Sequence, residues 1–414
     1  MTPDPITDLL RCPFCGTRLD VVENDALVRE GDRIVSGVIG CECCVFPIVD
    51  GIPVMIADDT TREAMHALEA GRVEDARLTL LGLTGERADA FRRLLARGDG
   101  MTYRDALDVL SPDPEGTYFI YRFSDPTYIV SHAIVQALSQ RQWPLAGRVL
   151  DLCGGCGHVT RALTALRPAG GTVLADVYFW KLWLAKRCTA PDAAAVCCDA
   201  NHPLPFARDT FSTVLLLDAF PYIWHRRMLA DEMMRVAGSA GVVMLPHLHS
   251  SLGENFAAGM ALTPAAYLDL FAPQKPRLFS DTALFAQVVE EARVDLGENA
   301  SAETIGAESS VTLIASPRAD LFGEYPVRPL LDVTGEMRVN PLYAVERRNG
   351  ASVLTLTFPT PEYEEEFGEC RRYLPETLTL DADLTGPLTP AMFGERYEEL
   401  RRRRILLDLP PNYI

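Results

Sequence analysis

Two pairs of cysteines near the start of the sequence have the spacing of metal ligands. Cys12 and Cys15 are separated by two residues, as are Cys41 and Cys44. Two tight turns of this kind can place four thiolates tetrahedrally around Zn²⁺, at Zn–S distances of about 2.3 Å. We therefore predict a structural zinc site of Cys12, Cys15, Cys41 and Cys44. Cys43 could replace Cys41 or Cys44 as a ligand, and the alternative is a set of buried cysteines without metal.

A glycine-rich turn, Cys153–Gly157, follows an apolar run that is typical of a buried strand. An apolar-periodic helix is expected after it, over residues 159–166. Glycine at a strand-to-helix turn lets a ligand approach the backbone closely, and the amides at the start of the helix can meet the charged end of that ligand. We therefore expect Gly154, Gly155 and Gly157 to form part of a cofactor site.

Three aspartates each follow a later strand-like run. The carboxylate of Asp176 can accept hydrogen bonds from both hydroxyls of a ribose. Asp199, together with the backbone amide of Ala200, can read an adenine edge, and Asp218 ends the next run. The series predicts that a nucleoside-containing cofactor binds along the edge of a sheet.

Candidates for chemistry at the substrate lie in two further loops. The loop Pro246–Ser250 holds His247 and His249, and a histidine with a pKa near neutrality is a natural general base. A structural role or a metal-ligand role for these histidines is the alternative. Tyr222, in the loop after Asp218, is the third candidate, either as a wall of the substrate pocket or as a core residue.

Strand and helix patterns alternate from residue 147 onward and predict a doubly wound α/β sheet. The expected strands are Arg148–Leu152, Thr172–Ala175, Ala195–Cys198, Thr213–Leu217, Gly241–Leu245 and Val311–Ala315. A helix is expected over about 226–236, and residues 280–296 should supply a late helix and a sixth strand. Open α/β sheets bind ligands beyond the carboxyl ends of their strands, so the turn, the aspartates and the histidines should meet at one edge.

The segments outside this core have less specific patterns. Thr60–Glu63 has the form of a helix capping box. Aromatic residues gather after residue 117, and Tyr118, Tyr121 or Tyr128 could roof a cofactor or substrate pocket or belong to the core. Near the C-terminus, Asn349-Gly350 between two alternating runs predicts a β-hairpin. We expect this last segment to cap the substrate pocket or to make a subunit contact.

The core resembles the class I S-adenosylmethionine-dependent methyltransferases over about residues 146–317. The resemblance is carried by Val149–Gly157, Asp176, Asp199–Phe206 with Phe211, Asp218, and Glu232–Val236. It implies a seven-stranded Rossmann-like sheet and S-adenosyl-L-methionine as cofactor. The cofactor-binding residues that it implies are Asp151, Cys153, Gly154, Gly155, Gly157, Asp176, Asp199, Ala200 and Asp218. Cys153 departs from the family, which has glycine there, and Thr160 departs from the dinucleotide fingerprint, so NAD is the less favoured cofactor.

The first segment, about residues 6–57, resembles the small zinc-ribbon proteins that activate tRNA and protein methyltransferases. This gives four predicted parts: a zinc-ribbon domain at 1–57, a helical connector or lid at 58–145, the cofactor-binding core at 146–317, and an α+β extension at 318–414. The extension is the part through which a homo-oligomer would form.

The composition of the chain limits the classes of partner and the compartment that we expect for the protein. The chain has 414 residues, 39 Lys and Arg against 57 Asp and Glu, and a net charge of −18. Phosphate backbones need a basic surface, so nucleic acid is disfavoured. No apolar run has the length of a membrane span, and 11 cysteines in clusters indicate a reducing compartment, so we expect a cytoplasmic protein.

These observations predict an S-adenosylmethionine-dependent methyltransferase acting on an O, N or C nucleophile of a small molecule, for instance in natural-product biosynthesis. One alternative is an RNA or protein methyltransferase whose zinc ribbon binds the substrate. The other is a non-catalytic scaffold of the same fold. Cys153 supports this alternative, because a side chain at this position of the predicted cofactor turn could crowd the cofactor.

Overall fold

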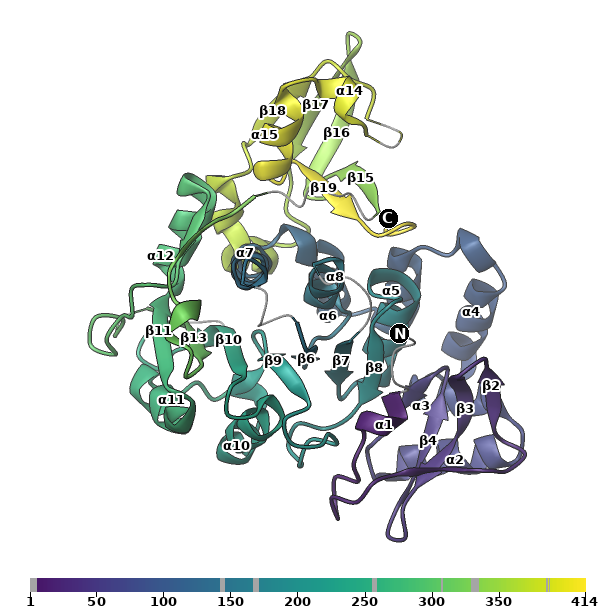
Figure 1. Cartoon of the computed structure of the whole chain (residues 1–414). Helices are drawn as coiled ribbons and strands as arrows, with labels where there is room; N and C mark the ends of the chain where they lie inside the picture. The colour runs from purple at the N-terminus through teal and green to yellow at the C-terminus, as the bar shows by residue number, and fades with distance from the viewer. Residues whose placement is uncertain are drawn as a thin grey trace.

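A seven-stranded mixed sheet forms the centre of the computed structural model (Figure 1), which describes residues 6–141, 146–166, 171–254, 259–306, 308–328, 335–384, 386 and 388–414. The strand order is β8-β7-β6-β9-β10-β13-β11. The strands are β6 (Arg148–Leu152), β7 (Thr172–Asp176), β8 (Ala194–Cys197), β9 (Phe211–Leu215), β10 (Val242–His249), β11 (Pro276–Ser280) and β13 (Ser310–Ala315). β6 to β10 are parallel, and β13 runs antiparallel between β10 and β11. The predicted seven-stranded α/β sheet is confirmed.

The sixth strand lies earlier than the sequence pattern indicated. It is β11, which ends at Ser280, where the predicted segment 280–296 begins. The helix of that segment is α12 (Asp281–Ala286), and its strand β12 (Arg293–Asp295) pairs outside the main sheet with β14 (Glu324–Pro326). The Ser280 side chain caps α12, so the polar end of β11 starts the helix.

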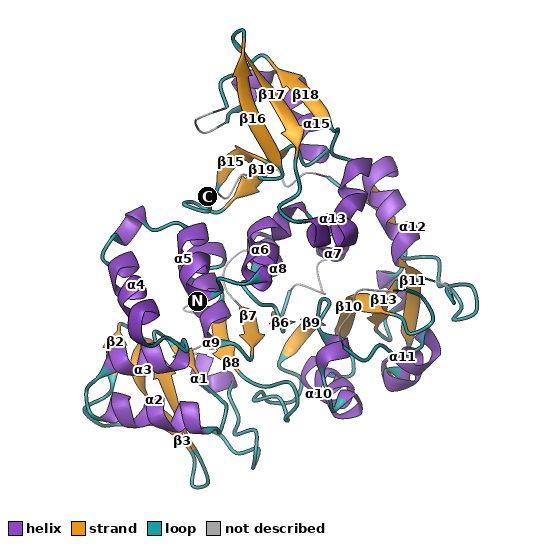
Figure 2. Cartoon of the chain, turned by 180° about the vertical axis from the view of Figure 1, so that it is seen from behind, coloured by secondary structure: helices purple, strands orange, loops and turns teal. Residues whose placement is uncertain are grey.

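Helices cover both faces of the sheet, because successive strand residues point to opposite sides. Val149 packs into one hydrophobic cluster, and its neighbour Leu150 packs into the other. The first face carries α7 (Pro126–Ser139), α8 (His158–Ala165) and α12, and the second carries α10 (Arg226–Ala237) and α11 (Pro264–Leu270) (Figure 2). None of the described helices is long and apolar enough to cross a membrane.

The N-terminal segment forms a separate antiparallel sheet beside the edge strand β8 (Figure 1). Its strands are β1 (Asp20–Val22), β2 (Val28–Glu30), β3 (Arg33–Gly40), β4 (Val45–Val49) and β5 (Ile52–Pro53). The chain that leaves β5 joins the main sheet: Val54 bridges Cys197 in parallel, and the Met55 amide donates to the Cys197 carbonyl at 2.7 Å. The N-terminal domain is thus docked on the core by backbone hydrogen bonds.

Helices connect the two sheets. The predicted boundary at residue 145 lies outside the described residues. The helices are α2 (Asp59–Glu69), α3 (Val73–Leu80), α4 (Gly85–Leu95), α5 (Tyr103–Leu110), α6 (Pro114–Tyr121) and α7. The predicted capping box at Thr60–Glu63 is wrong: the cap of α2 is Asp58, whose carboxylate accepts from the Thr61 amide at 2.7 Å. The Asp58 carboxylate accepts a hydrogen bond from this amide, and its negative charge is favourable at the positive N-terminal end of the helix dipole.

The C-terminal extension contains two small sheets. β15 (Glu336–Val339) pairs with β19 (Leu406–Leu409), and β16 (Tyr343–Arg348), β17 (Ala351–Leu356) and β18 (Thr377–Leu380) form the other. The predicted hairpin is confirmed, with Asn349 and Gly350 both at positive φ, as a two-residue turn of this hand requires. α13 (Pro361–Phe367) packs back toward α7 (Figure 2).

Candidate functional site

A cavity of about 310 Å³ lies between the end of β10 and the helices α7, α12 and α13. Its histidines, His247 and His249, come from β10, and Ser131 comes from α7. The carboxylates that line it are Glu254, Asp281, Glu365, Glu366 and Glu369. Among the described residues that line it there is no lysine or arginine. The cavity is therefore closed on one side by the C-terminal extension and is strongly acidic.

Each cavity histidine is paired with a carboxylate. His249 Nε2 lies 2.9 Å from Asp218 Oδ1, and His247 Nδ1 lies 3.1 Å from Asp281 Oδ2. Asp281 also accepts from the Thr312 hydroxyl at 2.6 Å. The other ring nitrogen of His249, Nδ1, is buried without a hydrogen-bond partner. The predicted neighbours Asp218, His247 and His249 are thus brought together, with one donor atom from each within 4.8 Å of the other two.

The backbone is strained at two of these residues. Asp218 has φ +60° and His247 has φ +55°, in the left-handed region that residues with a Cβ rarely adopt. β10 is also irregular here, because its register against β13 shifts between Leu245 and Leu248. Such conformations cost of order 1–3 kcal/mol each and persist where the surrounding structure imposes them. At this site they turn an aspartate and a histidine from adjacent strands toward one another.

The charges around the cluster shift its pKa values. Burial alone would raise the pKa of Asp218, but the hydrogen bond to His249 and the charges of His247 and Arg122 lower it below its usual value. Burial lowers the pKa of His247, and its bond to Asp281 outweighs that effect and raises it. Burial, followed by the nearby Asp218, raises the pKa of Glu366. The site therefore holds more negative charge than its two histidines balance.

The glycine turn lies at the neighbouring strand ends of the same sheet edge. Asp176 accepts from the Gly155 amide at 3.0 Å and from the Tyr178 amide at 2.9 Å, one bond on each carboxylate oxygen. Each oxygen keeps a lone pair that can accept a ribose hydroxyl. Asp199 is partly exposed, while Ala200 is buried. Two carboxylates can accept hydrogen bonds from a nucleoside, and the glycine turn offers backbone amides to an amino-acid tail, so the residues fit S-adenosylmethionine.

Asp151 and Cys153 have structural roles in this turn. Asp151 is buried, accepts from the Thr160 hydroxyl at 2.6 Å, and has its pKa raised to about 7 by burial. Cys153 has φ +56°, which explains why the resembling family has glycine there. Gly155 and Gly157 also have positive φ, and a Cβ on Gly154 would lie 2.5 Å from the Leu174 side chain. The turn accepts glycine without strain and cysteine only with strain.

Helix α6 covers the glycine turn. A Cβ on Gly155 would lie 3.0 Å from the Phe119 ring. Glu115, at the start of α6, forms a 2.6 Å ion pair with Lys181 of α9 (Phe179–Leu184), and the Lys181 ammonium lies 5.0 Å from the Phe119 ring centroid. The aromatic residue that roofs the turn is therefore Phe119, and none of the three tyrosines singled out in the sequence takes this position.

Arg122 connects the two halves of the site. It is 5% exposed, donates to Asp125 at 2.8 Å, and its charge lowers the pKa of both Asp151 and Asp218. The sheet gives the spatial relation: β6, which precedes the glycine turn, pairs with β9, which precedes Asp218, and β9 pairs with β10. The glycine turn and the His–Asp cluster therefore follow neighbouring strands at one edge of the sheet.

Tyr222 is not brought into this region. It lies in the short 3₁₀ helix Phe220–Tyr222, is 51% exposed, and is absent from the cavity lining. Its neighbour Phe220 is fully buried against Tyr267 and Phe271. Phe220 anchors the loop in the core, and this leaves Tyr222 on the outside.

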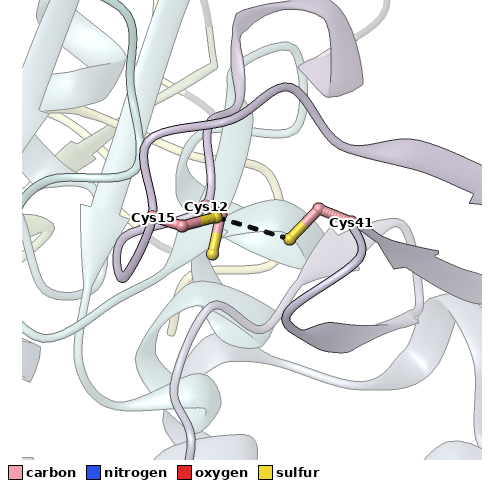
Figure 3. A group of neighbouring side chains, drawn as sticks. All are labelled: Cys12, Cys15 and Cys41. Atoms are coloured by element: carbon pink, nitrogen blue, oxygen red, sulfur yellow. Dashed lines mark hydrogen bonds between the residues drawn. The ribbon is translucent and has the colours of Figure 1, made fainter.

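Three of the four predicted zinc ligands meet in the N-terminal domain (Figure 3). Cys12 and Cys15 come from the first turn and Cys41 from the end of β3, with all three sulfurs within 4.8 Å of one another. The Cys15 and Cys41 sulfurs are 3.6 Å apart, close to the edge of a tetrahedral zinc–thiolate site, about 3.8 Å. The Cys44 sulfur is outside this group, while the Cys43 thiol interacts with Cys15. The donor set fits zinc and leaves the fourth ligand to one of these two.

Sequence patterns did not single out several residues of the site: Phe119, Arg122, Lys181, Asp281 and Glu366. Asp281 was detectable in part, since a serine–aspartate pair after a strand is a helix start. Glu366 belongs to an acidic run that is equally typical of a solvated helix face. Their roles depend on contacts between distant segments of the chain.

No protein-family model and no curated protein matches the sequence. Solved structures that resemble part of the chain include a SAM-dependent methyltransferase of Thermotoga maritima described as a possible histamine N-methyltransferase, with 10% identity, a TM-score of 0.34, and coverage of 52% of this chain and 100% of that one. Another is the complex of the Haloferax volcanii Trm112 methyltransferase activator with a putative methyltransferase. It has 18% identity and a TM-score of 0.35, and the match covers 52% of this chain and 98% of that one. A third is a putative methyltransferase of Bacillus halodurans, with 16% identity, a TM-score of 0.31, and coverage of 45% of this chain and 99% of that one.

Proposed function

We propose that the protein transfers a methyl group from S-adenosylmethionine to a small molecule bound in the acidic cavity. The observation that carries this proposal is the continuity of two half-sites along one edge of the sheet. A glycine turn and two carboxylates lie at the ends of β6, β7 and β8. The cavity lined by His247 and His249 lies at the end of β10, and Asp218, which bonds His249, follows β9.

The cofactor would be held by residues of the first half-site. Asp176 would bind the ribose, Asp199 and Ala200 the adenine, and the turn Gly154–Gly157 the methionine end, as the resemblance to class I methyltransferases implies. S-adenosylmethionine supplies an electrophilic methyl group on a sulfonium. The protein then has to orient a nucleophile in line with that group and accommodate its proton.

The size and the charge of the cavity support a small molecule as the substrate. The cavity volume of about 310 Å³ is in the range of small-ligand sites, and α13 of the C-terminal extension forms one wall. An acidic lining repels polyanions, so RNA is disfavoured as the occupant. We propose that the C-terminal extension acts as the substrate cap, and that His247 and His249 lie where the nucleophile is bound.

The N-terminal domain is proposed to be a zinc ribbon. Three convergent cysteine sulfurs and a short antiparallel sheet support a structural metal, which would stabilise a domain with little core of its own. The proposed role is structural, since the cysteines lie in the N-terminal domain, which joins the core at the edge strand β8.

Calorimetry with S-adenosylmethionine and S-adenosylhomocysteine tests the cofactor. We expect binding in the micromolar range, and Asp176→Ala should weaken it at least tenfold because the ribose hydroxyls lose their acceptor. Asp192→Ala, an exposed aspartate before β8, is the matched control and should bind as the wild type does. Absence of binding at millimolar cofactor would refute the enzyme and favour the non-catalytic scaffold.

A further inference from the structure

Three side chains beside the acidic cavity have the types and the spacing of metal ligands, and two of them, His247 and His249, line it. Asp218, His247 and His249 supply one carboxylate and two imidazoles whose donor atoms lie within 4.8 Å of one another. Two histidines and one carboxylate on one side of an ion, with the remaining positions open, are a recurrent arrangement for divalent iron and its neighbours. We propose that these three residues bind a divalent transition-metal ion whose open positions face the cavity.

The distances agree with ligation. Ligands held about 2.1 Å from an ion at right angles lie about 3 Å apart. His249 Nε2 and Asp218 Oδ1 are 2.9 Å apart, so a small rearrangement lets both bind one ion. The rings of His247 and His249 are also close, with centroids 4.9 Å apart. The three side chains already converge on a common point.

The surrounding groups have the arrangement that metal-binding histidines need. His247 uses Nδ1 to bond Asp281, which leaves Nε2 as its ligand atom, and Asp281 is itself held by the Thr312 hydroxyl. A carboxylate on the second nitrogen fixes the tautomer and orientation of a ligating histidine. This chain of Thr312, Asp281 and His247 orients a nitrogen that the hydrogen bonds of the described residues do not otherwise use.

An unsatisfied buried nitrogen is the independent sign of a missing ligand. His249 is 7% exposed, lines the cavity, and has its Nδ1 buried without a partner. A buried polar atom without a hydrogen-bond partner destabilises the folded protein. A group that bonds to this nitrogen would remove the penalty, so the site is completed by a partner that the described residues do not supply.

Charge favours a cation at the same place. Glu254, Glu365, Glu366 and Glu369 line the cavity, without lysine or arginine among the described lining residues. Arg122, the nearby cation, is already bonded to Asp125. A divalent ion would offset the repulsion among these carboxylates.

The metal would define the substrate class. If the proposed methyl transfer is correct, an oxygen of the substrate would occupy an open position of the ion, and its hydroxyl pKa would fall on coordination. A hydroxyl-bearing acceptor is then expected. Metal binding itself does not depend on the methyl-transfer proposal.

Titration with Mn²⁺ tests the site, because Mn²⁺ prefers nitrogen and oxygen donors and does not compete for the N-terminal thiolates. The full-length protein, dialysed against citrate to remove weakly held ions, should bind one Mn²⁺ with a dissociation constant in the micromolar range, read by calorimetry and by the loss of the free-ion EPR signal. His249→Ala and Asp218→Asn should each weaken binding at least tenfold, and Asp281→Asn by 10- to 100-fold through His247. His66→Ala, which removes an exposed histidine beside Glu69, should bind as wild type does.

The outcomes separate the two proposals. Circular dichroism and the zinc content of the N-terminal domain report whether each variant is folded, and Asp281→Asn leaves all three ligands in place. Equal Mn²⁺ affinity in wild type, His249→Ala and Asp218→Asn, or no binding at 1 mM Mn²⁺ to the wild type, would overturn the metal site. S-adenosylmethionine binding measured without metal tests the proposed function by itself.

Discussion

At the scale of single residues, the glycine turn Cys153–Gly157 shows how a local backbone conformation selects an amino acid. Cys153 has φ +56°, whereas Cys156 in the same turn does not have a positive φ. Both cysteines belong to the turn between β6 and α8, and Cys156 is fully buried. The pair allows the backbone effect to be separated from loss of the thiol.

We expect Cys153→Gly to be more stable than Cys153→Ala by about 1 kcal/mol, because only alanine retains the strain of the left-handed region. At Cys156 the order should reverse, with alanine more stable than glycine by roughly 0.5–1 kcal/mol, because glycine gains more entropy in the unfolded chain. Denaturant unfolding of the four variants measures both differences. The same order at both positions would contradict the assigned backbone conformation.

At the scale of elements, the C-terminal tail holds together the helices that surround the glycine turn. The ring of Tyr413 stacks on Tyr103 of α5 with centroids 4.5 Å apart, and its hydroxyl lies 2.9 Å from both His158 Nε2 in α8 and the Phe119 carbonyl in α6. The Tyr103 amide donates to the Asn412 carbonyl at 2.8 Å. One residue near the end of the chain therefore joins three helices.

Tyr413→Phe should destabilise the protein by about 1–3 kcal/mol, because the ring stays in place while a buried imidazole nitrogen and a carbonyl lose their partner. Tyr178→Phe, which removes the hydroxyl of a half-exposed tyrosine, should change stability by less than about 0.5 kcal/mol. Urea unfolding gives both values. Equal effects of the two substitutions would show that the tail does not hold these helices.

At the scale of the whole molecule, the N-terminal domain and the core are coupled through the edge strand β8. Hydrogen bonds from Met55 to Cys197 and from Arg11 to Pro205, at 2.7 and 3.0 Å, join the N-terminal domain to the core. Leu10 and Phe46 of the first domain share a hydrophobic cluster with the second face of the core. Loss of the N-terminal fold should therefore lower the stability of the core.

Metal analysis should find one equivalent of zinc fewer in Cys15→Ser than in the wild type, with a lower melting temperature of the whole chain, because the thiolates hold the turns that carry these contacts. Cys188→Ser, a partly buried cysteine of the core, should keep the wild-type zinc content. Full zinc retention in Cys15→Ser would exclude this cysteine as a ligand.

Patterns that act over a few residues were predictable from the sequence. The strand that ends at Asp176, the strand that precedes Asp218, the glycine turn and the Asn349-Gly350 hairpin follow from alternation and turn chemistry. The cap of α2 was misplaced by two residues because Asp58 and Thr60 are both good caps, and only the backbone conformation selects between them.

The sequence by itself determined which residue types follow the strands of the sheet, and these residue types predict a nucleoside-containing cofactor at its edge. The tertiary structure alone decided which partners those residues meet: Asp218 with His249, Asp281 with His247, Phe119 over Gly155, and Glu366 opposite the cluster. These groups come from segments far apart in the chain. Their convergence depends on strand order, register and the docking of the C-terminal extension, and no local periodicity encodes those three properties.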